Sequence, residues 1–163
     1  MPQSTRSCLH RANPDSPTDR LASVASRCRS RGLRLTPLRR QVLELLLADP
    51  RPQGAYSLID ALAKQSARTV NPPSVYRALQ FLMVHGFVAK IESENAFVAC
   101  SHPEQRQDCL FFVCDDCGSL AELTDSEVGQ LLAKNADSLG FEMTRPIVEI
   151  KGTCEDCLST LSN

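Results

Sequence analysis

Two closely spaced cysteine pairs are the part of the sequence with the clearest chemistry. Two residues separate the members of each pair, and 36 residues lie between the pairs, in the order Cys114, Cys117, Cys154 and Cys157. Four thiolates can surround one zinc ion tetrahedrally, which leaves no open coordination position and makes the site structural rather than catalytic. The spacing therefore predicts a structural zinc ion that is held by all four sulfur atoms.

A thiol–disulfide redox protein uses the same Cys-X-X-Cys spacing and is the alternative. Redox pairs generally lie at a helix N-terminus, where the helix dipole lowers the thiol pKa. Both pairs here are expected on turns that follow strands. The residues between the cysteines are acidic, and carboxylates raise the pKa of a neighbouring thiol; they are Asp115, Asp116, Glu155 and Asp156. These arguments favour zinc over redox chemistry.

Composition limits the classes of protein to which this chain can belong. Its 163 residues are 42% hydrophobic, which is enough for a folded core. The sequence has no run of 18 apolar residues and no apolar signal segment, so we expect neither a membrane span nor secretion. In the cytoplasm, eight cysteines favour metal binding over disulfides. No nucleophile–base pair or phosphate loop is visible, so we expect no enzyme activity.

Charge is distributed unevenly along the chain. Residues 1–90 contain 14 Lys and Arg against five Asp and Glu, a net charge of +9, whereas residues 91–163 contain four against 14, a net charge of −10. A phosphate backbone attracts the basic part and repels the acidic part. The asymmetry predicts a nucleic-acid-binding module followed by a module with another task.

The basic part has the pattern of a small helical domain that ends in a hairpin. Residues 1–17 have no periodic apolar pattern and are expected to form a disordered arm. Apolar periodicity and capping residues predict four helices, between Thr18 and Gly32, Thr36 and Pro50, Ala55 and Ser66, and Asn71 and Gly86. Residues 87–92 and 96–100 are rich in β-branched and aromatic residues and predict a hairpin. Residues 18–100 are therefore predicted to be a winged helix-turn-helix DNA-binding domain.

The third of these helices is expected to turn Leu58, Leu62 and Tyr56 inward. The fourth is expected to read DNA, with an inward stripe of Val75, Leu79 and Leu82. The side chains on or beside its opposite face are Ser74, Tyr76, Arg77 and Gln80.

An arginine can donate two hydrogen bonds to guanine, and a tyrosine ring can pack on a thymine methyl group. Arg77 and Tyr76 are therefore predicted to read bases in the major groove, the alternative being a half-buried Tyr76 and a solvated Arg77. The residues predicted to contact phosphates are Arg34, Arg39, Arg40 and Lys90.

The acidic part has strands around a single helix. The predicted strands are residues 110–114, 119–123 and 141–152. Thr124 and Glu127 predict a capping box for a helix that ends at Gly140. A unit of about 70 residues is marginal on its own, so residues 101–163 are expected to need a metal, a partner subunit, or both.

Taken together, these features resemble the ferric-uptake-regulator family of metal-dependent transcription factors, and most closely its zinc-uptake branch. The stretches that carry the resemblance lie between residues 20 and 157: RLTPLRRQVLELL, GAYSLIDAL, PPSVYRALQFLMVHGFVAKIES, NAFVAC, CDDCG and CEDC. The resemblance implies an α+β protein with an N-terminal winged helix-turn-helix and a small α/β dimerisation and metal-binding domain. It also implies a homodimer with one structural and one regulatory zinc ion per subunit, which represses zinc-uptake genes through an A/T-rich palindromic operator.

The regulatory site implied by the resemblance departs from the pattern of the branch. Members of the branch bind this metal through a wing-strand histidine, the cysteine that closes the hairpin, a histidine before the first cysteine pair and a glutamate after it. This chain has Cys100 and Glu122 at two of these positions, but Ala89 in the wing strand. We predict that His102 and Cys109 complete the set, because the resulting N/O/S₂ tetrahedron suits zinc.

Each predicted ligand also has an ordinary alternative. His102 would be a solvated loop histidine, Cys109 a buried thiol at a strand edge, and Glu122 a surface carboxylate. Asp108 and His85 are reserve ligands. The alternative function is an iron- or peroxide-responsive regulator on the same scaffold, and a thiol–disulfide redox protein is the weaker alternative.

Overall fold

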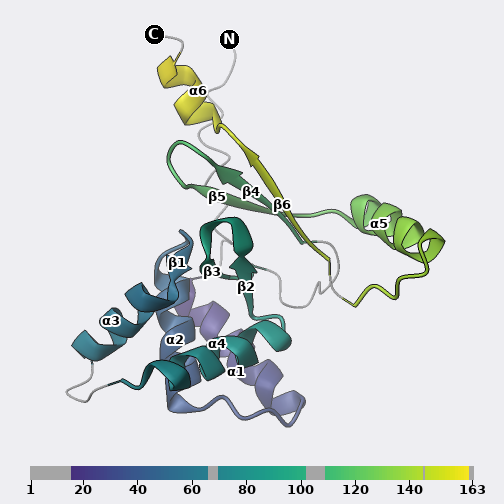
Figure 1. Ribbon diagram of the computed structural model, residues 1–163. Helices are drawn as coiled ribbons and strands as arrows, with labels where there is room; N and C mark the ends of the chain where they lie inside the picture. Colours follow the sequence, from purple (N-terminus) through teal and green to yellow (C-terminus); the bar gives the residue numbers. More distant parts are fainter. Residues whose placement is uncertain (1–15, 66–69, 102–108, 145, 162–163) are drawn as a thin grey trace. The chain divides into compact units, whose positions relative to one another are not determined.

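The computed structural model describes residues 16–65, 70–101, 109–144 and 146–161. The described residues fall into two compact units, one up to residue 101 and one from residue 109, which are described separately below. Each unit contains its own three-stranded sheet (Figure 1). The predicted N-terminal arm lies outside the described residues, except for its last two.

The described part of the first unit begins with four helices, as predicted. They are α1 (Pro17–Ser30), α2 (Pro37–Ala48), α3 (Ala55–Gln65) and α4 (Pro72–Val84). Three of them begin with proline, which has no N–H to leave unpaired in the first turn. The hydroxyls of Ser16 and Thr36 cap α1 and α2 by accepting backbone N–H groups. Asn71 precedes α4 as predicted, but its side chain makes no capping hydrogen bond.

The apolar faces of these helices form one core together with the hairpin. The predicted inward stripe of α4 is confirmed, because Val75, Leu79 and Leu82 are at most 1% exposed. The inward orientation predicted for Tyr56 is wrong, since this side chain is 78% exposed. Successive helical residues are about 100° apart, and the buried positions of α3 begin at Ala55, so Tyr56 is turned away from the buried face.

The wing follows α4 directly, and it is confirmed. Strands β2 (Val88–Ile91) and β3 (Ala96–Ala99) pair antiparallel, and the 3-10 turn η2 (Glu92–Glu94) and Asn95 connect them. Asn95 has a φ of 47°, the left-handed conformation that closes the turn. The short strand β1 (Gln53–Gly54) extends the sheet on the other side of β3. The first unit is therefore a winged helix-turn-helix.

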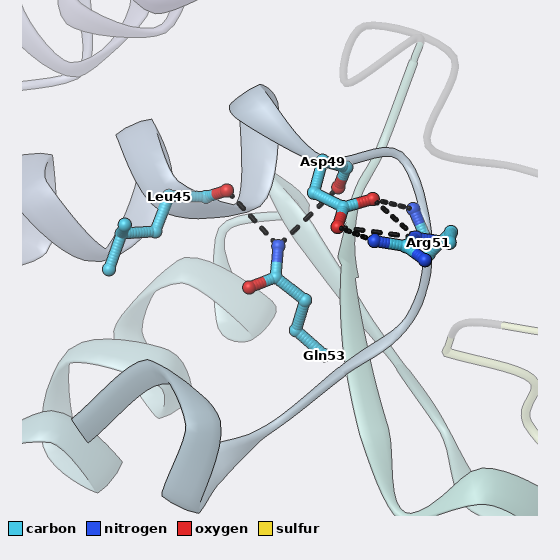
Figure 2. Close-up of polar contacts among 4 residues, drawn as sticks. All are labelled: Leu45, Asp49, Arg51 and Gln53. Carbon is cyan, nitrogen blue, oxygen red and sulfur yellow. Dashed lines mark hydrogen bonds and ion pairs between the residues drawn. The ribbon is translucent and has the colours of Figure 1, made fainter. Parts of the chain in front are cut away.

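Polar contacts connect the C-terminal end of α2 to β1 (Figure 2). The last carbonyls of a helix have no partner within the helix. The side-chain amide of Gln53 donates hydrogen bonds to the carbonyls of Leu45 at 3.1 Å and Asp49 at 3.5 Å. Arg51 hydrogen-bonds the Asp49 carboxylate at 2.7 Å and lowers its pKa. These contacts fix the segment that leads from α2 into the sheet.

The described residues of the second unit form a mixed sheet and two helices. Its elements are β4 (Cys109–Cys114), β5 (Leu120–Thr124), α5 (Ser126–Ser138), β6 (Ile147–Gly152) and α6 (Glu155–Leu161). Strand β4 is central, antiparallel to β5 and parallel to β6. A parallel neighbour requires a crossover connection, and α5 lies within that crossover.

Three local predictions for this unit are wrong. Helix α5 is capped by Asp125, whose carboxylate accepts two backbone N–H groups of its first turn. Thr124 is instead the last residue of β5. The last strand begins at Ile147 rather than at residue 141. The second cysteine pair lies at the start of α6 instead of on a turn after a strand.

The two units differ in the size of their cores. Among the described residues, 22 of the 27 buried apolar residues belong to the first unit. The other five all lie on β4: Cys109, Leu110, Phe111, Val113 and Cys114. The second unit therefore has little core of its own. No helix in the described part of the chain is long and apolar enough to cross a membrane.

Candidate metal centre and nucleic-acid interface

The four cysteines of the two pairs converge at one end of the β4–β6 pair. Their sulfur atoms all lie within 4.8 Å of one another. The Cys114 and Cys157 sulfurs are 3.9 Å apart, and those of Cys117 and Cys154 are 3.7 Å apart. A zinc ion with four sulfur ligands at about 2.3 Å requires sulfur–sulfur distances of about 3.8 Å. The geometry fits a tetrahedral four-sulfur zinc site.

The backbone around the cluster explains why sulfurs so distant in sequence meet. Strands β4 and β6 are in parallel register, with Cys114 opposite Gly152. The N–H of Asp115 donates to the Gly152 carbonyl at 2.9 Å, and the N–H of Gly118 donates back to the Cys114 carbonyl at 3.0 Å. Gly118 has a φ of 67°, in the left-handed region that residues with a Cβ atom disfavour. The tight turn thus presents Cys114 and Cys117 to the start of α6.

The electrostatic environment of the thiols also fits a cation. The backbone N–H of Cys154 donates to the Cys114 sulfur at 3.3 Å, and hydrogen bonds of this kind lower the pKa of Cys114 to about 6. The Ser119 hydroxyl lowers the pKa of Cys117, whereas contacts with Cys154 and Cys117 raise the pKa of Cys157. Thiols this close cannot all ionise unless a positive charge lies between them. A bound metal ion supplies that charge.

The second cysteine pair lies at the start of α6, which is also where a thiol–disulfide redox pair generally lies. The closest sulfur contacts, however, join different pairs, Cys114 with Cys157 and Cys117 with Cys154. A redox site would bring together the two cysteines of one pair. The geometry therefore favours a shared metal ion over a disulfide.

Helix α4 presents the predicted base-reading residues to solvent. Tyr76, Arg77 and Gln80 are exposed, and Ser74 is half-buried. Tyr76 is 46% exposed, so its ring is not part of the core. The buried stripe of the helix lies on the opposite side, and this leaves a polar and aromatic surface of the kind that enters a DNA groove.

Two of the predicted phosphate contacts form ion pairs within the domain. Arg40 pairs with Glu44 at 2.9 Å, one helical turn along α2, and Lys90 pairs with Glu92. Exposed pairs of this kind contribute little stability, so both cations can exchange their carboxylate for a phosphate.

Arg39 has a different environment. Its guanidinium carbon lies 3.5 Å from the centroid of the Phe81 ring, and its Nη1 donates a hydrogen bond to the Arg34 carbonyl. Phe81 in turn packs edge-on against His85, with ring centroids 4.5 Å apart. His85, the C-cap residue that follows α4, therefore packs on the end of the helix, and its role as a reserve ligand stays a prediction.

The comparison with known proteins agrees with this geometry. The sequence profile of the Ferric uptake regulator family matches residues 30–151. The chain belongs to this family. The Zinc uptake regulation protein of Escherichia coli is 36% identical over 139 residues, 85% of this chain and 81% of that protein. The protein of the same name from Mycobacterium tuberculosis is 31% identical and covers 78% of this chain and 97% of its own length.

Solved structures agree with the family assignment and with the branch. A zinc uptake regulator complexed with zinc and DNA matches with a TM-score of 0.84 and 33% identity, over 91% of this chain and 99% of that chain. Holo XcZur matches with a TM-score of 0.80 and 41% identity, over 88% and 99%. The Peroxide-responsive repressor PerR of Staphylococcus aureus is only 22% identical. The predicted membership of the zinc-uptake branch is confirmed.

Of the regulatory ligands predicted from this family pattern, the structure brings two together. The Cys109 sulfur lies 3.7 Å from Oε1 of Glu122. Cys109 and Glu122 share a face of the second sheet. Cys109 and Phe111 are two residues apart on β4 and so lie on the same face, and Phe111 pairs with Glu122. Cys100 is buried at the end of β3 in the first unit. His102 lies outside the described residues, as does the reserve ligand Asp108, so the complete set stays a prediction.

The backbone of Cys100 is fixed on both sides. Its N–H donates to the Phe87 carbonyl at 3.0 Å, and its carbonyl accepts a hydrogen bond from Arg20 of α1 at 3.0 Å. Sequence reasoning missed Arg20, because 80 residues separate it from Cys100 and no spacing pattern connects them. Ala89, at the position where the branch has a histidine, is fully buried opposite Val98 and offers no ligand.

Proposed function

We propose that the chain is a zinc-responsive, DNA-binding transcriptional regulator that represses zinc-uptake genes when zinc is bound. One observation carries this proposal: a winged helix with an exposed Arg77 face and a cluster of four converging thiols occur in one chain of the ferric uptake regulator family. The likeness to a zinc uptake regulator complexed with zinc and DNA supports both halves of the proposal.

In this proposal, α4 enters the major groove of an A/T-rich palindromic operator. Arg77 donates two hydrogen bonds to a guanine, and Tyr76 packs on a thymine methyl group. Ser74 and Gln80 make further polar contacts. The cations proposed to contact phosphates are Arg40 of α2, Lys90 of the wing and Arg34 of the loop before α2.

A structural zinc ion is proposed to bind Cys114, Cys117, Cys154 and Cys157. The cluster is supported by its sulfur–sulfur distances and by the small core of the second unit. Zinc bound there joins the end of β4 to α6 and stabilises the sheet. The position has no chemical task, because four sulfur ligands complete the coordination shell.

A homodimer is proposed because the second sheet exposes an apolar face. Phe112, Leu123 and Ile150 are 41%, 47% and 38% exposed. They share one face, since Phe112 pairs with Ile150 and since Leu123 pairs with Leu110, two residues before Phe112. The described residues of the second unit leave this face open, and we infer that a second copy of the chain covers it. A dimer also supplies the two reading helices that a palindrome requires.

A second, regulatory zinc is proposed to bind Cys100, His102, Cys109 and Glu122. The contact between Cys109 and Glu122 supports half of this set. Cys100 belongs to the first unit and the other pair to the second, so a metal held by all of them restricts the relative motion of the units. By linkage, specific DNA then raises zinc affinity by the same factor by which zinc raises DNA affinity.

The proposal is tested by fluorescence anisotropy of a labelled A/T-rich palindromic duplex, titrated with protein at buffered free zinc and again with iron(II). DNA affinity is expected to rise steeply with zinc and much less with iron. Binding that ignores zinc would contradict the proposal. A stronger response to iron, or loss of binding on mild peroxide treatment, would favour the iron- or peroxide-responsive alternative.

A further inference from the structure

We propose that Arg39 is a positioning residue for DNA recognition. Its guanidinium holds the reading helix α4 against α2 and the loop before it, and it does not neutralise a phosphate. This inference rests on the proposed DNA-binding function and replaces the phosphate contact that the sequence suggests for Arg39. It explains why one of two adjacent arginines is half-buried against a ring while the other is exposed.

The contacts of Arg39 join three segments of the first unit. Arg39 itself lies in the first turn of α2. Its guanidinium stacks on the Phe81 ring of α4 at 3.5 Å and donates to the carbonyl of Arg34 in the preceding loop. A cation within about 6 Å of an aromatic centroid is attracted by the negative face of the ring. The Arg39–Phe81 stack therefore ties α2, the loop and α4 together.

The stack extends along the last turn of α4. The Phe81 and His85 rings meet at 62° with centroids 4.5 Å apart, an edge-to-face arrangement that aromatic pairs prefer. His85 therefore braces Phe81 from the side of the helix end, while Arg39 covers a ring face. Phe81 is thus held by two partners, the C-cap residue of its own helix and a residue of α2.

Phe81 lies where it controls the direction of the reading residues. It follows Gln80 directly and lies four residues after Arg77, one turn along the same side of the helix. About 100° per residue puts Phe81 some 40° from Arg77 around the helix, between Arg77 and the buried stripe. The stripe fixes α4 from one side and the Arg39–Phe81 stack fixes it from the flank. Together they set the rotation of α4 about its axis, and hence the direction in which Arg77 points.

Arg40 provides the matched comparison. Its side chain is 54% exposed and pairs within α2, with Glu44. Arg39 carries the same charge one residue earlier, but one face of its guanidinium is covered by a ring and one donor is bound to a backbone carbonyl. Removing Arg39 and removing Arg40 are therefore expected to change the salt dependence of DNA affinity differently, because only phosphate contacts release counterions from DNA.

The test uses the zinc-loaded, full-length protein with Arg39→Lys, Arg39→Ala, Phe81→Leu, Arg39→Lys together with Phe81→Leu, or Arg40→Ala. Dissociation constants are measured by anisotropy for an operator duplex and an unrelated duplex at several salt concentrations. Arg39→Lys keeps the charge but loses the planar stack, so operator binding is expected to weaken about fivefold. Phe81→Leu should weaken it equally, and the double variant should lose no more than either single one. The slope of log affinity against log salt should stay unchanged in all four variants at Arg39 and Phe81, including Arg39→Ala, which removes the charge.

Arg40→Ala should instead reduce that slope by about 0.9, the value for one lost phosphate contact. The proposal is overturned if Arg39→Lys binds the operator like the wild type. It is also overturned if Arg39→Ala lowers the salt slope as Arg40→Ala does. Should Phe81→Leu not fold, the affinity of Arg39→Lys and the salt slope of Arg39→Ala still decide between the two roles.

Failure of the proposed function gives a separate result. A wild-type protein that prefers no operator over the unrelated duplex at any zinc level would refute DNA recognition itself. Thermal denaturation of the same variants then reports on the stack without DNA: non-additive shifts in Tm for Arg39 and Phe81 show that the contact exists. Additive shifts would show that Arg39 and Phe81 do not act together.

Discussion

Loss of the four-cysteine cluster should unfold the second unit and leave the first one folded. Cys117→Ser is the cleanest change, because Cys117 is exposed and the substitution removes a ligand without placing a hydroxyl in the core. Cys114→Ser and Cys154→Ser should have the same effect. Structural zinc contributes about 10–16 kcal/mol in small metal-dependent domains, whereas a whole domain is stable by only about 5–15 kcal/mol.

The distribution of the core decides which unit depends on the metal. In the part of the chain that the structure describes, five of the 27 buried apolar residues lie in the second unit, so apolar burial there cannot replace a contribution of that size. The first unit, with 22 buried apolar residues, has no such dependence. A reciprocal control is Cys28→Ser, which places a hydroxyl in the core of the first unit, where Cys28 is 1% exposed.

Hydrogen–deuterium exchange with mass spectrometry measures both units in one experiment. In Cys117→Ser, protection should be lost over β4, β5 and β6 and kept over α1 to α4, with one zinc fewer per chain by elemental analysis. Cys28→Ser should give the opposite pattern, with weaker protection in α1 and an intact second unit. A Cys117→Ser protein that stays dimeric, with a protected second sheet, would refute the assignment of this cluster as a structural zinc site.

Four further predictions concern the remaining sites. Cys100→Ser should abolish the rise of DNA affinity with zinc while size-exclusion chromatography still shows a dimer; a retained zinc response would exclude Cys100 as a ligand. Arg77→Ala should weaken operator binding by about 1–3 kcal/mol and relax discrimination between operator variants, which competition anisotropy measures. Gln53→Ala removes the donor to the end of α2 and should cost about 1–2 kcal/mol of unfolding free energy in urea, whereas exposed Gln65→Ala should not. Zinc affinity of the cluster should fall as the pH falls. Below about 6, where Cys114 gains its proton in the zinc-free protein, the slope of log affinity against pH should steepen by about one.

The helices, the wing and the metal cluster could be predicted from the sequence because local signals determine them. Proline and a capping hydroxyl define the start of α2, and Gly86, with a φ of 78°, ends α4. The Cys-X-X-Cys spacing lets the two sulfurs of a pair reach one metal ion. Each helix start and each cysteine pair can be recognised without knowing how distant segments pack, although the register of β4 and β6 is what brings the two pairs together.

The features that could not be predicted depend on contacts between distant segments. Arg20 reaches the Cys100 carbonyl across 80 residues of sequence, and Arg39 stacks on a ring 42 positions further along. The predicted orientation of Tyr56 was wrong. An aromatic residue next to buried positions in the sequence suggests an inward side chain, but helical geometry turns Tyr56 outward. Asp125 and Thr124 both suit an N-cap, and only the end of β5 decides between them.

The unequal cores also constrain how zinc can regulate DNA binding. The reading helix is held by its own buried stripe, by the Arg39–Phe81 stack and by the wing, all within the first unit. Its fold therefore does not depend on the second unit, and the regulatory metal proposed here has no need to fold it. Zinc then acts by restricting the motion of units that are already folded, a change that costs conformational entropy and no core contacts. On this view, variants at Cys100 should alter the zinc dependence of DNA binding while the exchange protection of α4 remains that of the wild type.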